Sequence, residues 1–178
     1  MIDNLIDEVI DREGGYVHHP ADRGGATRWG ITEAVARREG YGDAMHTLPR
    51  GVAAAIYRRL YWTRPGLDAV AARAPALAAE LFDTGVNMGP AVAAGFLQRA
   101  LNALNRGAGD YPDLALDGQV GPATLAALDA FLRTRGPAGE TVLVKAADAL
   151  QGERYLRLAE QRPANEAFLY GWLANRLG

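Results

Sequence analysis

Residues 13–32 read EGGYVHHPADRGGATRWGIT, and this stretch divides the start of the chain into a helix and a hairpin. Upstream of it, apolar residues recur three and four positions apart, which predicts an amphipathic helix ending at Glu13. Two glycines follow, and glycine readily takes the left-handed conformation that ends helices. Residues 16–17 and 28–31 are expected to form short extended pieces around a turn. The apolar positions of the helix are Ile2, Leu5, Ile6, Val9 and Ile10.

This stretch contains two carboxylates, Glu13 and Asp22, and the hydroxyl of Thr27, which are the groups that cleavage of a glycosidic bond requires. That reaction needs a protonated carboxyl at the leaving oxygen and an ionised carboxylate near the sugar or an attacking water. Glu13 would lie at the negative end of the helix dipole, which disfavours an ionised carboxylate. Asp22 could face it from the hairpin, and Thr27 could hold the water. Alternatively, Glu13 is a solvated glutamate, and Asp22 is a turn residue that bonds its own backbone.

Several motifs resemble glycoside hydrolase family 108, the lysozyme-like N-acetylmuramidases of phages and bacteria. The N-terminal resemblance lies in EGGY, in the Asp-x-Gly-Gly-x-Thr run and in WGIT. The order of Glu13, Asp22 and Thr27 is also similar to that of phage lysozymes. Later motifs resemble the second half of the family, described as a predicted peptidoglycan-binding domain. These are FDTGVNMGP (82–90), FLQRALN (96–102), LDGQVGPATLAAL (116–128) and FLYGWLANRL (168–177).

The resemblance implies a mainly α, lysozyme-like α+β fold: a helical bundle around a long central helix, with a small β-hairpin beside the cleft. It implies a catalytic region over residues 1–90 and a helical peptidoglycan-binding region over 91–178, packed as one globule. The implied reaction is hydrolysis of the β-1,4 bond between N-acetylmuramic acid and N-acetylglucosamine. In it Glu13 is the catalytic acid, and Asp22 and Thr27 are its partners.

Two other functions stay open at this point. The chain could bind peptidoglycan, or assist lysis or secretion, without catalysis, or it could cleave chitin or chitosan-type chains by the same carboxylate chemistry. Whether the mechanism inverts or retains stereochemistry depends on the separation of the carboxyl groups, which the sequence does not give.

The rest of the chain is expected to be helical. An apolar stripe over residues 52–60 predicts one helix, and Pro75 is expected to begin a second. A third, over residues 92–104, is expected to be the central helix of the core. Residues 105–122 form one long irregular stretch and the best candidate boundary between regions. Pro122 is well placed to begin the next helix, and two or three helices fill the remainder.

Polar and aromatic residues beyond the hairpin could contact a glycan. Asp83 and Asn87 lie four positions apart and therefore share a helix face. They could bond sugar hydroxyls or acetamido groups, or they could form a buried polar pair. Gln98 has the same two interpretations. Aromatic rings can present flat faces to sugars, although core packing is expected for at least two of the three candidates. These are Trp29, Tyr61 and Trp62.

No metal or cofactor is expected. His18 and His19 are adjacent, so their side chains diverge, and apart from His46 the chain has no further histidine and no HExxH motif. The loop at Asp117 lacks the alternating ligands of a calcium site.

The composition indicates where the protein is made and which partners it can bind. The 178 residues include no cysteine, and no apolar run is long enough to span a membrane, so stable membrane insertion is not expected. The N-terminal residues lack the pattern of a signal peptide. We therefore expect a monomer made in the cytoplasm that acts on peptidoglycan glycan strands after release. A holin or a secretion system would export it, in a phage or prophage endolysin, gene-transfer or secretion setting. Nucleic-acid binding is not expected, because Lys145 is the single lysine and the arginines are interleaved with acidic residues.

Overall fold

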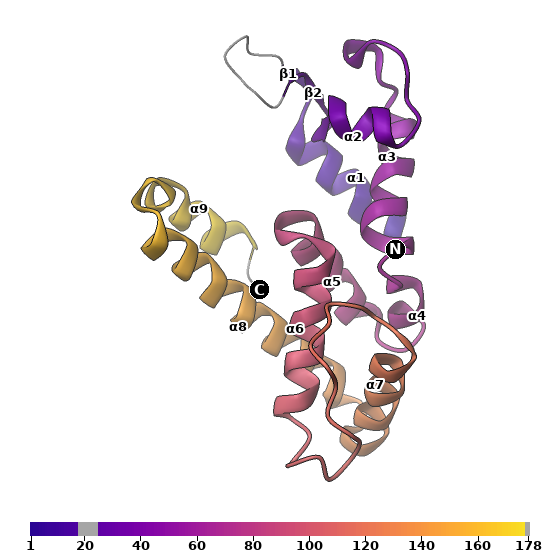
Figure 1. The fold of residues 1–178 in the computed structure, drawn as a ribbon, viewed down its shortest axis with the longest axis vertical. Coiled ribbons are helices and arrows are strands. Elements are labelled where there is room, and N and C mark those ends of the chain that lie inside the picture. Colours follow the sequence, from indigo (N-terminus) through magenta and orange to yellow (C-terminus); the bar gives the residue numbers. More distant parts are fainter. Residues whose placement is uncertain (18–24, 177–178) are drawn as a thin grey trace. The chain divides into compact units, whose positions relative to one another are not determined.

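The computed structural model describes residues 1–17 and 25–176 and divides the chain into two compact units, Met1–Trp62 and Thr63–Gly178 (Figure 1). Asp22, an expected catalytic residue, lies outside the described residues. Each unit has its own buried core. This division, after Trp62, falls earlier in the chain than the expected boundary between the catalytic and the peptidoglycan-binding regions near residue 90.

The first unit begins with helix α1, which confirms the apolar stripe as a buried face. Ile6, Val9 and Ile10 are each at most 4% exposed. Gly14, at φ 76°, ends the helix, and its N–H donates to the Ile10 carbonyl over 3.1 Å. The elements of this part are α1 (Ile2–Glu13), β1 (Tyr16–Val17), β2 (Thr27–Arg28), β3 (Ile31–Thr32), α2 (Glu33–Arg38), the 3-10 helix η1 (Met45–Thr47), α3 (Arg50–Tyr57) and the π-helical η2 (Arg58–Thr63).

Within the described residues, the strands form one antiparallel sheet in the order β1-β2-β3. The expectation that residues 28–31 form a single extended piece is wrong, because Trp29 and Gly30 form a two-residue turn between β2 and β3. Both residues have positive φ, 55° and 74°. Positive φ at both central positions is the requirement of the type I′ turn, whose twist matches that of the paired strands.

Ion pairs connect the exposed side of α1 to α3 and to the start of η2. The Arg50 guanidinium lies 2.8 Å from the Asp7 carboxylate and 2.6 Å from that of Asp11, and Arg58 pairs with Asp3. The hydrogen bonds that Arg50 donates to Asp11 and Asp7 raise the pKa of its guanidinium above the ordinary value. Pairs this open to solvent add little stability. The buried faces of the two helices therefore hold them together, and the ion pairs add orientation.

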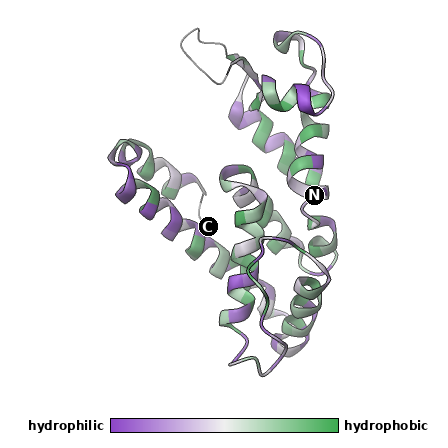
Figure 2. Cartoon of the chain, in the orientation of Figure 1, coloured by the Kyte–Doolittle hydropathy of each residue, from purple (hydrophilic) through white to green (hydrophobic). Residues whose placement is uncertain are grey.

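The second unit is helical throughout its regular elements, which confirms the mainly α fold. Pro75 and Pro122 begin α5 and α7, as expected. The expected central helix corresponds to α6, which ends one residue before the predicted end at Leu104. It packs against α5, α7 and α8, and α8 also contacts α5, α7 and α9. Figure 2 shows mainly apolar residues along α7 and polar ones along much of α8. The elements are α4 (Leu67–Ala71), α5 (Pro75–Met88), α6 (Pro90–Ala103), α7 (Pro122–Arg135), α8 (Ala138–Gln161), the 3-10 helix η3 (Pro163–Asn165) and α9 (Glu166–Arg176).

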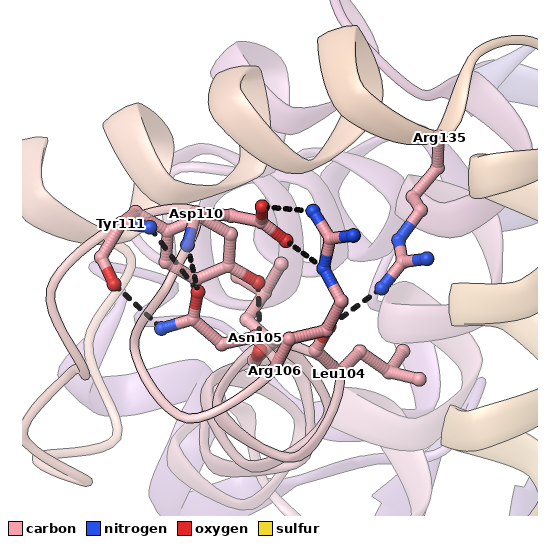
Figure 3. A network of polar contacts seen from close by, with 7 residues as sticks. Leu104, Asn105, Arg106, Asp110, Tyr111 and Arg135 are labelled. Carbon is pink, nitrogen blue, oxygen red and sulfur yellow. Dashed lines mark hydrogen bonds and ion pairs between the residues drawn. The ribbon is translucent and has the colours of Figure 1, made fainter.

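The irregular segment between α6 and α7 is fixed at its start by one buried amide. Asn105 donates to the Tyr111 carbonyl over 2.6 Å and accepts from the backbone N–H groups of Asp110 and Tyr111 (Figure 3). Arg135 of α7 donates to the Leu104 carbonyl over 3.0 Å. The start of the segment is thus irregular in conformation yet hydrogen-bonded, as buried backbone must be.

Candidate active site

Glu13 is the last residue of α1, and its side chain is exposed. The chain leaves the helix at Gly14 and enters β1 two residues later. The carboxyl of Glu13 therefore lies where the helix turns into the sheet, and solvent or a ligand can reach it.

The Trp29–Gly30 turn lies against the base of the Glu13 side chain. The backbone N–H of Trp29 donates to the Gly14 carbonyl over 3.2 Å, which connects the turn to the end of α1. A Cβ atom on Gly30 would lie 2.8 Å from Cγ and 3.0 Å from Cβ of Glu13. Atoms that close would collide, so Glu13 can keep this position only if residue 30 is glycine.

Tyr57, the last residue of α3, supports the same turn. Its hydroxyl donates to the Trp29 carbonyl over 3.1 Å and would contact a Cβ atom on Gly30. The residue is 3% exposed. Burial, and then the negative charge of Glu13, raise the pKa of Tyr57 above its ordinary value, so the hydroxyl keeps its proton. Three segments therefore meet beside Glu13: the end of α1, the hairpin turn and α3.

Sequence patterns did not single out Tyr57 or Gly30 as parts of this site. Tyr57 belonged to an apolar stripe, and Gly30 to an expected strand. Two signals point to them in retrospect. A buried tyrosine hydroxyl needs a hydrogen-bond partner, and a glycine directly after Trp29 in a short hairpin suits a turn that requires positive φ.

Trp29 and Thr27 lie on the same hairpin as Gly30. The Trp29 indole donates from Nε1 to the Leu48 carbonyl over 3.0 Å. The guanidinium carbons of Arg28 and Arg50 lie 5.2 and 5.9 Å from its ring centre. The indole is thus anchored by its polar edge and flanked by two cations. Thr27 is partly buried on β2. The roles of Thr27 in holding water and of Trp29 in binding sugar stay predictions.

Tyr61 and Trp62 take different positions on η2. The Tyr61 ring lies 5.7 Å from the ring of Tyr57 and is partly exposed, and burial raises its pKa. Trp62 is 2% exposed and belongs to the core. Tyr61 therefore borders the group around Glu13 through Tyr57, and its contact with a glycan stays a prediction.

The other substrate-binding candidates lie in the second unit. Asn87 donates from Nδ2 to the backbone carbonyl of Asp83 over 2.9 Å and to its carboxylate over 2.8 Å. Gln98 is 1% exposed. It donates to Asp117 over 2.7 Å and to the Gln119 carbonyl over 2.9 Å, and its Oε1 accepts from a backbone N–H. Gln98 thus uses its amide to hold the irregular segment, whereas its contact with substrate is untested.

Residues 1–17 and 25–176 contain no group of three or more His, Cys, Asp or Glu side chains arranged to hold a metal ion. In the same part of the chain, no helix is long and apolar enough to cross a membrane.

The two halves of the sequence match two different families of known proteins. Residues 6–89 match the family described as glycosyl hydrolase 108, and residues 92–177 match a predicted peptidoglycan domain. The structure is similar to that of Brucella abortus SagA, with a TM-score of 0.59 and 27% identity over 94% of this chain and 95% of that chain. No curated protein matches the sequence. The first half of the chain therefore matches the glycosyl hydrolase 108 family and the second half a predicted peptidoglycan domain, which supports glycoside hydrolase activity on cell-wall glycan.

Proposed function

We propose that the protein hydrolyses the β-1,4 bond between N-acetylmuramic acid and N-acetylglucosamine, with Glu13 as the general acid. The observation that carries this proposal is the fixed position of Glu13. Its carboxyl is exposed at the end of a helix whose apolar face is buried, while the Gly30 turn packs against the base of its side chain. A proton donor must be both reachable by substrate and held in one place, because misplacement by about 1 Å can cost roughly 100-fold in rate.

Glu13 would protonate the oxygen that leaves the muramic acid ring as positive charge develops on the sugar. General acid catalysis of this kind contributes about 10²–10⁴-fold to the rate. Asp22 would supply the ionised carboxylate, either to stabilise that charge or to activate water, and Thr27 on β2 would hold the water. Inverting and retaining enzymes both use such a pair, so the stereochemical outcome is a separate measurement on the products.

We assign the cleavage chemistry to residues 1–90 and recognition of the wall to residues 91–178. The ranges of the two matching families support this assignment, since they meet near residue 90. Release through a holin or a secretion system, in a phage, prophage or gene-transfer setting, is the corresponding proposal for how the enzyme reaches its substrate. Neighbouring genes that encode a pore or a secretion machine would support it.

Digestion of purified peptidoglycan tests the reaction. The wild-type protein should release soluble fragments with reducing N-acetylmuramic acid ends, identified by mass spectrometry. Glu13→Gln should bind the same wall and release roughly a thousandfold less, because the amide cannot donate the proton. Glu8→Gln, the same change on an exposed position of α1, is the matched control and should digest normally.

Two results would contradict the proposal. Retained digestion by Glu13→Gln would remove Glu13 from the chemistry. Faster cleavage of chitin oligomers than of peptidoglycan would replace the muramic acid substrate by a chitin-type chain.

A further inference from the structure

A pocket of about 310 Å³ lies in the second unit, at a place where α5, α8 and α9 contribute side chains. Its size falls at the small end of the range for ligand sites, roughly 300–1,000 Å³. Helix α9 packs on α8 beside it. The lining residues are Asn87, Met88, Arg154, Tyr155, Leu158 and Trp172.

Arg154 is the charged residue of this pocket. Its Nε atom is buried and has no hydrogen-bond partner. Among the described residues, no ion pair satisfies its guanidinium either. In contrast, the guanidinium of Arg157, one turn later on the same helix, forms an ion pair with Glu153 over 2.5 Å. A buried N–H without a partner costs free energy, so a bound anion that accepts from the Arg154 Nε would be favoured.

The wall beside Arg154 is aromatic and held in place. The rings of Tyr155 and Trp172 stack with centres 5.2 Å apart. Gln151 donates to the Tyr155 hydroxyl over 3.1 Å and accepts from Thr84 over 3.0 Å. Both Gln151 and Thr84 are fully buried. This chain of hydrogen bonds fixes the tyrosine, and the tyrosine supports the indole, so the wall is formed before any ligand binds.

Asn87 of α5 adds a hydrogen-bond acceptor to the lining of the pocket. Its Nδ2 group donates twice to Asp83, to the backbone carbonyl and to the side chain. With both hydrogens used in this way, the amide oxygen of Asn87 is the group left to face a ligand. The pocket therefore offers a cation, an acceptor and an apolar wall within one small volume.

We propose that this pocket binds the free carboxylate end of a peptide, as carried by the stem peptides of peptidoglycan. The guanidinium of Arg154 would take the carboxylate in a bidentate pair. Asn87 would accept from the amide N–H of the terminal residue, and the small side chain of that residue would pack on Trp172. A neutral sugar would leave the guanidinium without its counter-charge. The proposal depends on peptidoglycan being the substrate of the enzyme.

Isothermal titration of the full chain with N-acetyl-D-alanyl-D-alanine tests the binding. The acid should bind about tenfold or more tightly than the C-terminal amide of the same dipeptide, because only the acid pairs with Arg154. Arg154→Gln should lose the preference for the acid. Arg157→Gln, a surface change of the same chemistry, should keep it. Equal binding of acid and amide to the wild type, or absent binding, would overturn the proposal. Inorganic phosphate that competes as strongly as the acid would also overturn it, in favour of a general anion site.

A second readout separates this proposal from the assignment of Glu13. Titration uses Glu13→Gln as well as wild type, since peptide binding in the second unit does not require the general acid. Digestion kinetics then compare intact peptidoglycan with glycan strands freed of peptide by an amidase. Arg154→Gln should raise KM for the intact wall about tenfold and leave kcat and the values for peptide-free strands unchanged. A uniform loss on both substrates would assign Arg154 a purely structural role.

Discussion

Gly30 holds Glu13 in position by having no side chain of its own. A Cβ atom at residue 30 would lie 2.8 Å from the Glu13 Cγ, and it would also collide with the Tyr57 hydroxyl. The backbone of the turn therefore forms the surface on which the glutamate rests. This contact connects a residue of α1 to a turn 17 positions later in the sequence.

Gly30→Ala should lower kcat by roughly 10–100-fold, because the added methyl group displaces the Glu13 side chain from its position. The alanine also has an unfavourable backbone at φ 74°, worth about 1 kcal/mol. Gly40→Ala controls for that strain, since Gly40 has φ 94° and no atom within 4 Å of an added Cβ. Peptidoglycan turnover should fall in Gly30→Ala alone, and an equal loss in both variants would contradict the contact.

Tyr57→Phe should reduce kcat roughly tenfold with little change in KM, because the turn loses the hydroxyl that holds the Trp29 carbonyl. The free energy of unfolding should fall by about 1 kcal/mol, the usual value of one internal hydrogen bond. Tyr41→Phe is the matched control, because its hydroxyl bonds Thr47 over 2.9 Å on the exposed surface. Wild-type kinetics in Tyr57→Phe would show that the turn holds Glu13 without the tyrosine.

Asp22→Asn should lose turnover on peptidoglycan by roughly 100-fold or more if Asp22 supplies the second carboxylate, because asparagine keeps the shape and removes the charge. The temperature of unfolding, followed by circular dichroism, should stay near that of the wild type. A loss below about threefold would identify Asp22 as a turn residue instead.

Gln98→Ala should lower the free energy of unfolding by about 2–4 kcal/mol, since it leaves buried polar partners of the irregular segment unsatisfied. Gln98 is also the main reason why the pKa of Asp117 lies below its usual value. Denaturation in urea measures the effect. Gln119→Ala is the control, because the backbone carbonyl of Gln119, which the variant retains, accepts the bond from Gln98. A loss below about 1 kcal/mol would mean that water replaces the Gln98 amide.

Glu80 should make the second unit less stable as pH rises. Burial, and then the charges of Asp148 and Asp83, raise the pKa of Glu80 from 4.5 to about 7. The folded state therefore holds a proton that the unfolded state releases. The protonated Glu80 therefore stabilises the folded state fully below pH 4.5, and this stabilisation is lost as pH rises through 7.

The expected loss across that window is roughly 2 kcal/mol, after allowing for screening at a partly exposed site. Glu80→Gln should remove this part of the pH dependence, as measured by urea denaturation at pH 4.5, 6 and 8. Glu153→Gln, an exposed change on α8, should behave as the wild type does. Parallel pH profiles for wild type and Glu80→Gln would contradict the shifted pKa.

Local patterns in the sequence were sufficient for the helices. The spacing of Ile6, Val9 and Ile10 predicted the buried face of α1, and Pro75 and Pro122 predicted the starts of α5 and α7. Periodicity and proline stereochemistry act within a few residues, so they can be interpreted without the fold. The hairpin turn could not be predicted in this way. It requires a positive φ at residue 29, and tryptophan rarely adopts that backbone conformation.

The sequence by itself determined the mainly helical fold, the resemblance to a glycoside hydrolase family and the candidate acid, because Glu13 stands in a short contiguous motif at a helix end. Only the tertiary structure decided what surrounds that acid. Gly30 and Tyr57 reach it from a turn and from α3, and Arg154, Asn87 and Trp172 reach one pocket from separate helices. Such contacts depend on how distant segments pack and on which polar groups are left without partners, and no local pattern encodes either.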